Sequence, residues 1–194
     1  TWGFIGDGHA LLRNFRSSSI PTASYHLDLY FGISRQNSMV DDPFWNTDYV
    51  FTPDGGSQKG FDALGINHFY IRPGVFEKEC FFGQRRDDLV ASVGFVGALD
   101  FYHEEWLPYR QQLKQFLSTY EGFRHWPGNG PVMRGDDLND LYASIDVVVG
   151  DSLCVGFKHP YYWSDRVYET IGRGGMLVMP RIRGLEDEFV DGET

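Results

Sequence analysis

The sequence is poor in cysteine. Its two cysteines, Cys80 and Cys154, lie far apart and match no metal-binding spacing, so we interpret them as buried free thiols of a reducing, cytoplasmic compartment. Long apolar runs are missing too, and no segment reaches the length of a membrane-spanning helix. The start, TWGFIGDGHA, lacks the pattern of a signal peptide, and its first residue is Thr, which indicates a fragment or a processed piece.

Basic residues are fewer than acidic ones. The chain has 17 Lys and Arg against 27 Asp and Glu, and the resulting net charge of −10 disfavours sequence-independent binding to nucleic acid. No two aspartates stand at positions i and i+2, and there is no Cys/His cluster, so the sequence predicts neither a carboxylate-held divalent ion nor a zinc site. A P-loop and a G-x-S-x-G elbow are also missing.

The residues that are present favour a packed α/β protein. Hydrophobic residues make up 42% of the chain and aromatic residues 16%, unlike a disordered chain. Apolar runs alternate with segments of helical periodicity, which predicts parallel sheets. We expect a strand that enters a loop over residues 20–29, and strands over residues 49–52, 66–71, 89–96, 123–126, 145–149 and 176–179. We expect helices over residues 10–15, 55–64, 108–120, 136–142 and 164–171.

The predicted elements divide into two domains. Charged residues increase between Phe76 and Asp88, so we place a first domain over residues 1–76 and a second over residues 77–194. The βαβαβαβ order of the second domain predicts a doubly wound sheet. In such sheets the ligand binds beyond the carboxyl ends of the strands.

The most informative stretch is Tyr161–Gly184, YYWSDRVYETIGRGGMLVMPRIRG. Ser164 or Asp165 can cap a short helix, and the following glycines can end it. Arg166 stands in the first helical turn, where the helix dipole makes a cation cost roughly 0.3–1 kcal/mol. A bound anion reverses that cost, whereas an Arg166–Glu169 surface pair explains the same residues without a ligand. The residues alone leave both interpretations open.

This stretch resembles the donor-binding segment of GT-B glycosyltransferases, in particular the group 1 glycosyltransferase domain of CgeB-like proteins. The family pattern is an Arg, an aromatic-Glu pair, a Gly-rich turn and a strand that ends before Gly-Leu-Glu. The corresponding residues here are Arg166, Tyr168-Glu169, Gly174-Gly175 and Gly184-Leu185-Glu186. Residues 48–83 resemble the end of a GT-B N-terminal domain. The resemblance covers about residues 20–191 and implies a GT-B-like fold, with a Rossmann-type parallel sheet in the second domain and a partial Rossmann-like domain at the N-terminus.

The resemblance implies a metal-independent glycosyltransferase, with a nucleotide-diphosphate sugar as donor substrate, no further cofactor, and a carbohydrate or other acceptor. In the family the Arg contacts the donor diphosphate, the Glu contacts the ribose hydroxyls, and the turn after the first strand of this domain lies beside the phosphates. A second family Glu, eight residues before the first, is replaced here by Tyr161, which leaves the donor sugar and the stereochemistry open. The residues assigned to donor binding are Arg166, Glu169, Tyr168, Gly97, Ser164, Gly174 and Gly175.

Polar residues also follow two other predicted strands. His26 and Asp28 come after the first strand, and either can act as a base toward an acceptor, so we assign them the catalytic role. A structural role is the competing interpretation, as it is for most histidines at strand ends. Asp151 and Ser152 follow a buried strand and either meet donor hydroxyls or cap the next loop.

Three further side chains have two interpretations each. Arg110 matches a recurrent family position, but we expect an exposed arginine on a helix. His125 and Trp126 can flank a nucleobase, although packing at a strand end is the favoured explanation for Trp126.

Three alternatives to this transferase remain open. A nucleotide-sugar epimerase uses the same fold and donor site but needs acid/base carboxylates over the sugar. A non-catalytic sugar-nucleotide-binding module is favoured by the replacement of a Glu with Tyr161. A transferase that acts on modified DNA bases is the third, and the net charge of −10 weighs against that acceptor.

Overall fold

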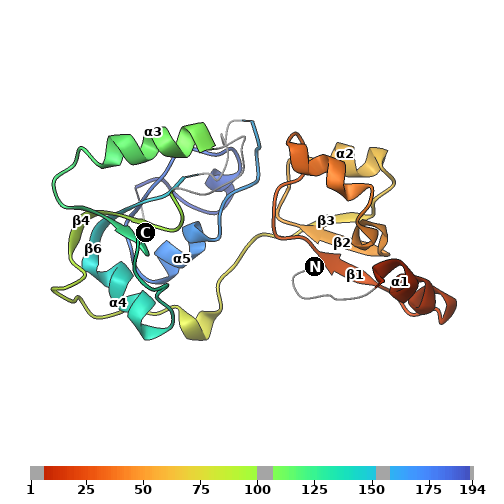
Figure 1. The fold of residues 1–194 in the computed structure, drawn as a ribbon, viewed down its shortest axis with the longest axis horizontal. Coiled ribbons are helices and arrows are strands. Elements are labelled where there is room, and N and C mark those ends of the chain that lie inside the picture. Colours follow the sequence, from red (N-terminus) through yellow and green to blue (C-terminus); the bar gives the residue numbers. More distant parts are fainter. Residues whose placement is uncertain (1–6, 100–106, 152–157, 193–194) are drawn as a thin grey trace. The chain divides into compact units, whose positions relative to one another are not determined.

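The computed structural model describes residues 7–99, 107–151 and 158–192. Over these ranges the chain is an α/β protein that separates into two compact units, Thr1–Arg72 and Pro73–Thr194 (Figure 1). The division lies four residues before the predicted boundary at residue 76, where Pro73 interrupts the chain after the last strand of the first unit. None of the helices in the described ranges has the length and apolar character that crossing a bilayer requires.

The first unit contains a three-stranded parallel sheet in the order β1-β2-β3. Its strands are β1 (Ala23–Tyr25), β2 (Tyr49–Thr52) and β3 (His68–Tyr70), and its helical elements are α1 (Gly8–Ser17), η1 (Ser34–Met39), η2 (Pro43–Asn46) and α2 (Gln58–Ala63). The bounds predicted for β2 are confirmed. Residues 20–29, predicted as a strand that enters a loop, contain the three residues of β1, which pair with Tyr49–Phe51 of β2.

One face of this sheet carries the core of the first unit. Val50 of β2 packs with Phe61 of α2, Trp45 of η2 and Met39, and all four are buried. Phe61 also stacks on the His68 ring, with the ring centroids 3.8 Å apart. Aromatic packing from α2 and η2 therefore fixes the helical elements on this face.

The second unit contains a four-stranded parallel sheet in the order β5-β4-β6-β7. Its strands are β4 (Ala91–Val96), β5 (Phe123–Trp126), β6 (Ile145–Val149) and β7 (Leu177–Val178). The helical elements are η3 (Glu77–Glu79), α3 (Leu107–Leu117), α4 (Asp136–Ser144), α5 (Arg166–Gly172) and η4 (Leu185–Asp187). The bounds predicted for β5 and β6 are confirmed, and the sheet is Rossmann-like.

The helices of the second unit lie on both faces of its sheet (Figure 1). Leu117 of α3 packs against Phe95 on one face. Leu141 of α4 packs against Val148 and Trp126 on the other. The chain moves from β4 to β5 in one direction and then crosses to β6 on the opposite side of β4. The direction of winding therefore reverses between β4 and β6, which makes their carboxyl ends the topological switch point.

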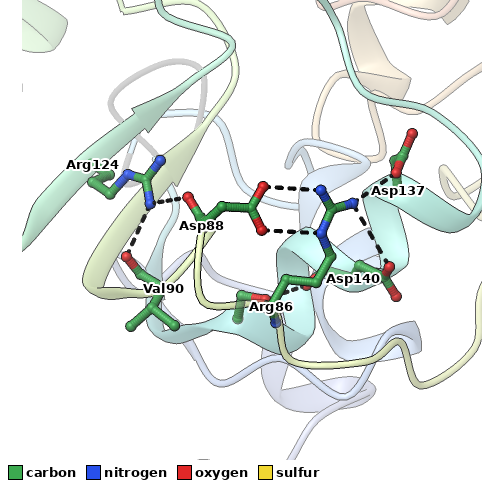
Figure 2. Close-up of polar contacts among 7 residues, drawn as sticks. Arg86, Asp88, Val90, Arg124, Asp137 and Asp140 are labelled. Carbon is green, nitrogen blue, oxygen red and sulfur yellow. Dashed lines mark hydrogen bonds and ion pairs between the residues drawn. The ribbon is translucent and has the colours of Figure 1, made fainter.

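A network of charges fixes α4 to the segment that leads into β4. Arg86 binds both carboxylate oxygens of Asp88, at 3.2 and 2.9 Å, and donates from Nη1 to Asp137 of α4 at 2.9 Å (Figure 2). Arg124 of β5 donates to the backbone carbonyl of Asp88 at 2.7 Å. These exposed pairs each contribute little to stability, but together they hold the segment in one register along the helix.

The closest approach of this segment to α4 is at Gly83. A Cβ atom at Gly83 would lie 2.2 Å from the backbone carbonyl carbon of Asn139, so only glycine fits there. The backbone N–H of Gln84 then donates to Asp140 at 2.8 Å, and that of Arg86 donates to Ser144 Oγ at 2.9 Å.

We expect Gly83→Ala to lower the free energy of unfolding of the second unit by about 3 kcal/mol, because the methyl group must displace a helix backbone. Urea denaturation followed by circular dichroism measures this change. Gly74→Ala is the matched control, since a Cβ at Gly74 meets no atom within 4 Å. Equal stability of the two variants would contradict the packing of this segment on α4.

Candidate functional site

The candidate site is a cavity of about 210 Å³ beside the switch point. It is lined by the ends of two strands, by the loop that enters α4, and by the first turns of α4 and α5. The lining residues are Val96, Gly97, Trp126, Pro127, Val132, Met133, Arg134, Leu138, Leu141, Arg166 and Glu169. Most of this wall is apolar, and its charged groups are two arginines and one glutamate.

Arg166 joins the two strands of the switch point. Its Nε donates to the carbonyl of Val96 at 2.5 Å, and its Nη1 donates to Asp151 at 3.1 Å. The guanidinium carbon lies 4.8 Å from the centre of the Phe95 ring. Arg166 is 9% exposed, so the expected surface pair with Glu169 does not describe it.

Asp151 is shared by two arginines. It accepts from Arg110 Nε at 2.6 Å and Nη2 at 3.2 Å, in addition to its bond with Arg166. Arg110 also donates to the carbonyl of Ala98. The expectation of an exposed helical arginine is wrong, because Arg110 is 1% exposed. Two buried cations share one buried anion, so the cluster of Arg110, Asp151 and Arg166 carries one net positive charge.

The missing side chain of Gly97 leaves room for the guanidinium of Arg166. The φ of +135° at Gly97 is a conformation that side chains disfavour, and a Cβ there would lie 2.2 Å from Arg166 Nη2. Among the described residues, the hydrogen bonds to the guanidinium use Nε and Nη1. Nη2 therefore lies over the Gly97 backbone at the cavity wall, where it retains donors for a ligand.

The amino end of α5 is capped by the protein itself. Ser164 is buried, and its Oγ accepts from the backbone N–H of Arg166 at 3.2 Å. The N–H of Val167 bonds to the Ser164 carbonyl, and that of Glu169 bonds to the Asp165 carbonyl. The expected anion over this helix end therefore competes with the cap, and the guanidinium is the better anion-binding group. Of the two cap residues that the sequence allows, Ser164 makes the capping bond and Asp165 does not, while the role of Ser164 in donor binding stays a prediction.

Glu169 is the acidic group of the cavity. It is half-buried, and no described residue donates a hydrogen bond to its carboxylate in this structure. Burial raises its pKa and Asp165 raises it further, while Arg173, Arg166 and Arg134 oppose the shift. A partly desolvated carboxylate next to cations is suited to accept paired hydroxyl or amino donors from a ligand.

The other predicted donor-binding residues lie away from the cavity. The Tyr168 hydroxyl donates to Glu188 at 2.6 Å, and its ring contacts Phe189. Gly174 and Gly175 precede β7 and lie at the opposite end of α5 from the cavity. A Cβ at Gly174 would lie 2.1 Å from the Phe82 ring, so this glycine allows close packing. The contacts of these three residues in this structure are therefore packing contacts within the second unit, and their role in donor binding stays a prediction.

His125 and Trp126 point to opposite faces of β5. Trp126 lines the cavity on the α4 face and is 8% exposed. His125 lies against Phe95 on the α3 face, and its Nε2 bonds to the Gly97 carbonyl at 2.6 Å. Only Trp126 is thus placed to contact a ligand in this cavity, whereas His125 fixes the glycine turn. Ser152 lies outside the described residues.

The two predicted catalytic residues belong to the first unit. His26 is 8% exposed, and its ring stacks on Trp45 with centroids 3.8 Å apart. Burial lowers its pKa, which favours the neutral ring. The Asp28 carboxylate forms an ion pair of 2.6 Å with Arg35. The His26 ring is thus buried, whereas the Asp28 side chain is 43% exposed, and the catalytic roles of both residues stay predictions.

Sequence reasoning did not single out two titratable groups of the first unit, His68 and Asp54. The His68 Nδ1 bonds to Gln58 and its Nε2 to Thr52, and burial lowers its pKa to about 4. Asp54 is 2% exposed, its Oδ1 accepts from the N–H of Gly56, and burial raises its pKa to about 6. The Asp-Gly-Gly sequence after β2 indicates the turn, but burial of the carboxylate depends on the tertiary packing.

We expect Asp151→Asn to lower the free energy of unfolding of the second unit by about 3–5 kcal/mol, because it leaves two buried arginines without an anion. Asp146→Asn is the matched control. Asp146 is 53% exposed and pairs with Arg85, so its loss is expected to cost less than about 1 kcal/mol. Chemical denaturation measures both, and equal costs would contradict the shared-anion arrangement.

Asp54 predicts a specific pH dependence. Between pH 3.8 and about 6 the folded state binds its proton more tightly than the unfolded state, so ionisation of Asp54 destabilises the unit as pH rises. We expect the stability of Asp54→Asn relative to the unsubstituted protein to increase by about 3 kcal/mol from about pH 3 to about pH 7. Urea unfolding across this range tests it, with the exposed Asp41→Asn as control. A parallel profile for both variants would contradict the buried carboxylate.

Among the described residues, no group of three or more His, Cys, Asp and Glu side chains could hold a metal ion. No protein-family model, curated protein or solved structure matches the chain. The function therefore has to be argued from the cavity and from the shared anion at the switch point.

Proposed function

We propose that the second unit binds a nucleotide-diphosphate sugar and that the chain is a GT-B-type glycosyltransferase, which moves the sugar to an acceptor. The observation that carries this proposal is the position of Arg166. Asp151 and the Val96 carbonyl hold its guanidinium at the switch point, with Nη2 over the backbone of Gly97 at the cavity wall. Rossmann-like sheets bind nucleotides at this place, and a fixed guanidinium suits a phosphate there.

The charge of the site supports a multiply charged ligand. The cluster of Arg110, Asp151 and Arg166 retains one positive charge, and Arg134 adds a second cation to the cavity wall. A diphosphate needs such compensation when no metal ion is bound. When the bond between the sugar and the diphosphate breaks, negative charge grows on the leaving oxygen, so a cation fixed beforehand favours the transfer step.

The rest of the cavity suits the nucleoside part of the ligand. Trp126, Pro127 and Met133 supply an apolar wall against which a planar base can pack. Glu169 supplies a carboxylate that can accept from both hydroxyls of a ribose. In the transfer itself, an acceptor oxygen forms a bond to the sugar carbon, the bond to the diphosphate breaks, and the acceptor proton passes to a base that we do not assign to a residue.

A non-catalytic nucleotide-sugar-binding module is the second candidate. It is favoured by the engagement of His26 with Trp45 and of Asp28 with Arg35. Tyr161, at the position of a family Glu, points the same way, because its ring packs close to the backbone of Gly184.

Titration with UDP, GDP and ADP tests the donor site. We expect Arg166→Met to weaken binding of the preferred nucleotide about 10–100-fold, because it removes a charge-assisted hydrogen bond. Asp151 keeps its two bonds to Arg110 in this variant, so the fold is expected to survive. Glu169→Gln should weaken binding about tenfold if the carboxylate accepts ribose hydroxyls.

Arg85→Met is the matched control, since Arg85 is half-exposed and pairs with Asp146 away from the cavity. Calorimetry measures the affinities. No nucleotide binding by the unsubstituted chain, or equal affinity in Arg166→Met, would refute the proposal. If nucleotide binds, a labelled nucleotide sugar separates the functions: sugar on an acceptor or on water indicates a transferase, an isomerised donor indicates an epimerase, and an unchanged donor favours the binding module.

A further inference from the structure

The sheet of the first unit has a second face, which is aromatic and open to solvent. Tyr25, Phe51 and Phe69 are register partners on the three strands, so their side chains form a row across this face. Tyr49 and Ile71 extend the row, and the Tyr49 and Phe69 rings lie 6.0 Å apart. We call these five residues the aromatic face. They alternate along the strands with Val50, Thr52 and His68, which are buried beneath α2 and η2.

The aromatic face is unusual for a parallel sheet. Such sheets are normally covered on both faces, because their strands are apolar on both sides. Here four members of the face, Tyr25, Tyr49, Phe69 and Ile71, are 43–48% exposed, whereas Val50 on the other side is fully buried. Burial of large aromatic side chains is among the strongest contributions to association, and Tyr and Phe are enriched in interface centres.

Charge decides which partner suits this face. No member of the aromatic face is charged, so an anionic or cationic ligand has no counter-charge there. The first unit, residues 1–72, has seven Asp and Glu against five Lys and Arg, a net charge of −2, whereas residues 73–194 have 20 against 12, a net charge of −8. Charge repulsion between two copies is therefore weakest at the first unit. An uncharged face can also pack against the same face of a second copy without burying a charge.

We propose that the aromatic face is a dimer interface with a second copy of this chain, formed by two sheets packed face to face around a two-fold axis. Four half-exposed side chains and the more buried Phe51 offer roughly 500 Å² per copy, so a symmetric pair buries roughly 1,000 Å², at the lower limit for a specific interface. The dimer is consequently weak and reversible. This inference does not depend on the proposed function, because it concerns the first unit alone.

Sedimentation velocity over a concentration series tests the interface, from about 1 μM to about 300 μM, a range that brackets a weak dimer. We expect a monomer–dimer equilibrium that Phe69→Asp weakens at least about tenfold, since a two-fold axis places both new carboxylates in the interface. Val40→Asp is the matched control, because Val40 is 82% exposed in the same unit and lies outside the aromatic face. It should leave the equilibrium unchanged.

Circular dichroism checks that each variant is folded, and Ile71→Asp, at the end of β3, replaces Phe69→Asp if that variant unfolds. A chain that stays monomeric over the whole range overturns the proposal, whatever other partner the face then takes. A dimer that persists equally in Phe69→Asp and Ile71→Asp also overturns it, since the contact then lies elsewhere. Loss of the dimer in the face variants but not in Val40→Asp supports it.

Discussion

The packing at the carboxyl edge of the second unit's sheet depends on one carboxylate, that of Asp151. Asp151 is fully buried at the end of β6 and binds two arginines from elements far apart in the sequence, Arg110 of α3 and Arg166 of α5. A buried charge is costly unless it is paired and hydrogen-bonded, and here each arginine also donates to a carbonyl at the end of β4. The three-way contact joins helices from both faces of the sheet at its switch point and leaves one positive charge for a ligand.

The same contact explains why the site lies at this edge. Parallel strands bring all their carboxyl ends to one side, where the chain is free of ladder hydrogen bonds and can turn. Gly97 makes that turn with a backbone conformation that leaves room for Arg166. Arg86 holds the segment that enters β4 against α4 (Figure 2), and Gly83 lets this segment pass close to the helix backbone. The helix that forms one wall of the cavity is thus anchored to the segment that enters β4.

The first unit buries two titratable groups that do not pair with each other as an anion and a cation. His68 and Asp54 are buried and have their pKa values shifted in opposite directions, one to about 4 and the other to about 6. As pH falls through this range, titration of His68 lowers the stability of the unit, whereas titration of Asp54 raises it. The two contributions therefore oppose each other. Their shared environment is the covered face of the sheet. The aromatic face on the other side carries no ionisable group other than tyrosine.

The sequence by itself determined the α/β class and the bounds of β2, β5 and β6, because apolar runs and glycine breaks are local signals. It did not determine the partners of Arg166, since Asp151 and Arg110 are 15 and 56 positions away and look like an ordinary strand-end aspartate and helical arginine. Only the tertiary structure brought them together. These charged residues are buried together in the folded chain. A charge that is removed from water needs a counter-charge, and the element that packs beside it supplies one.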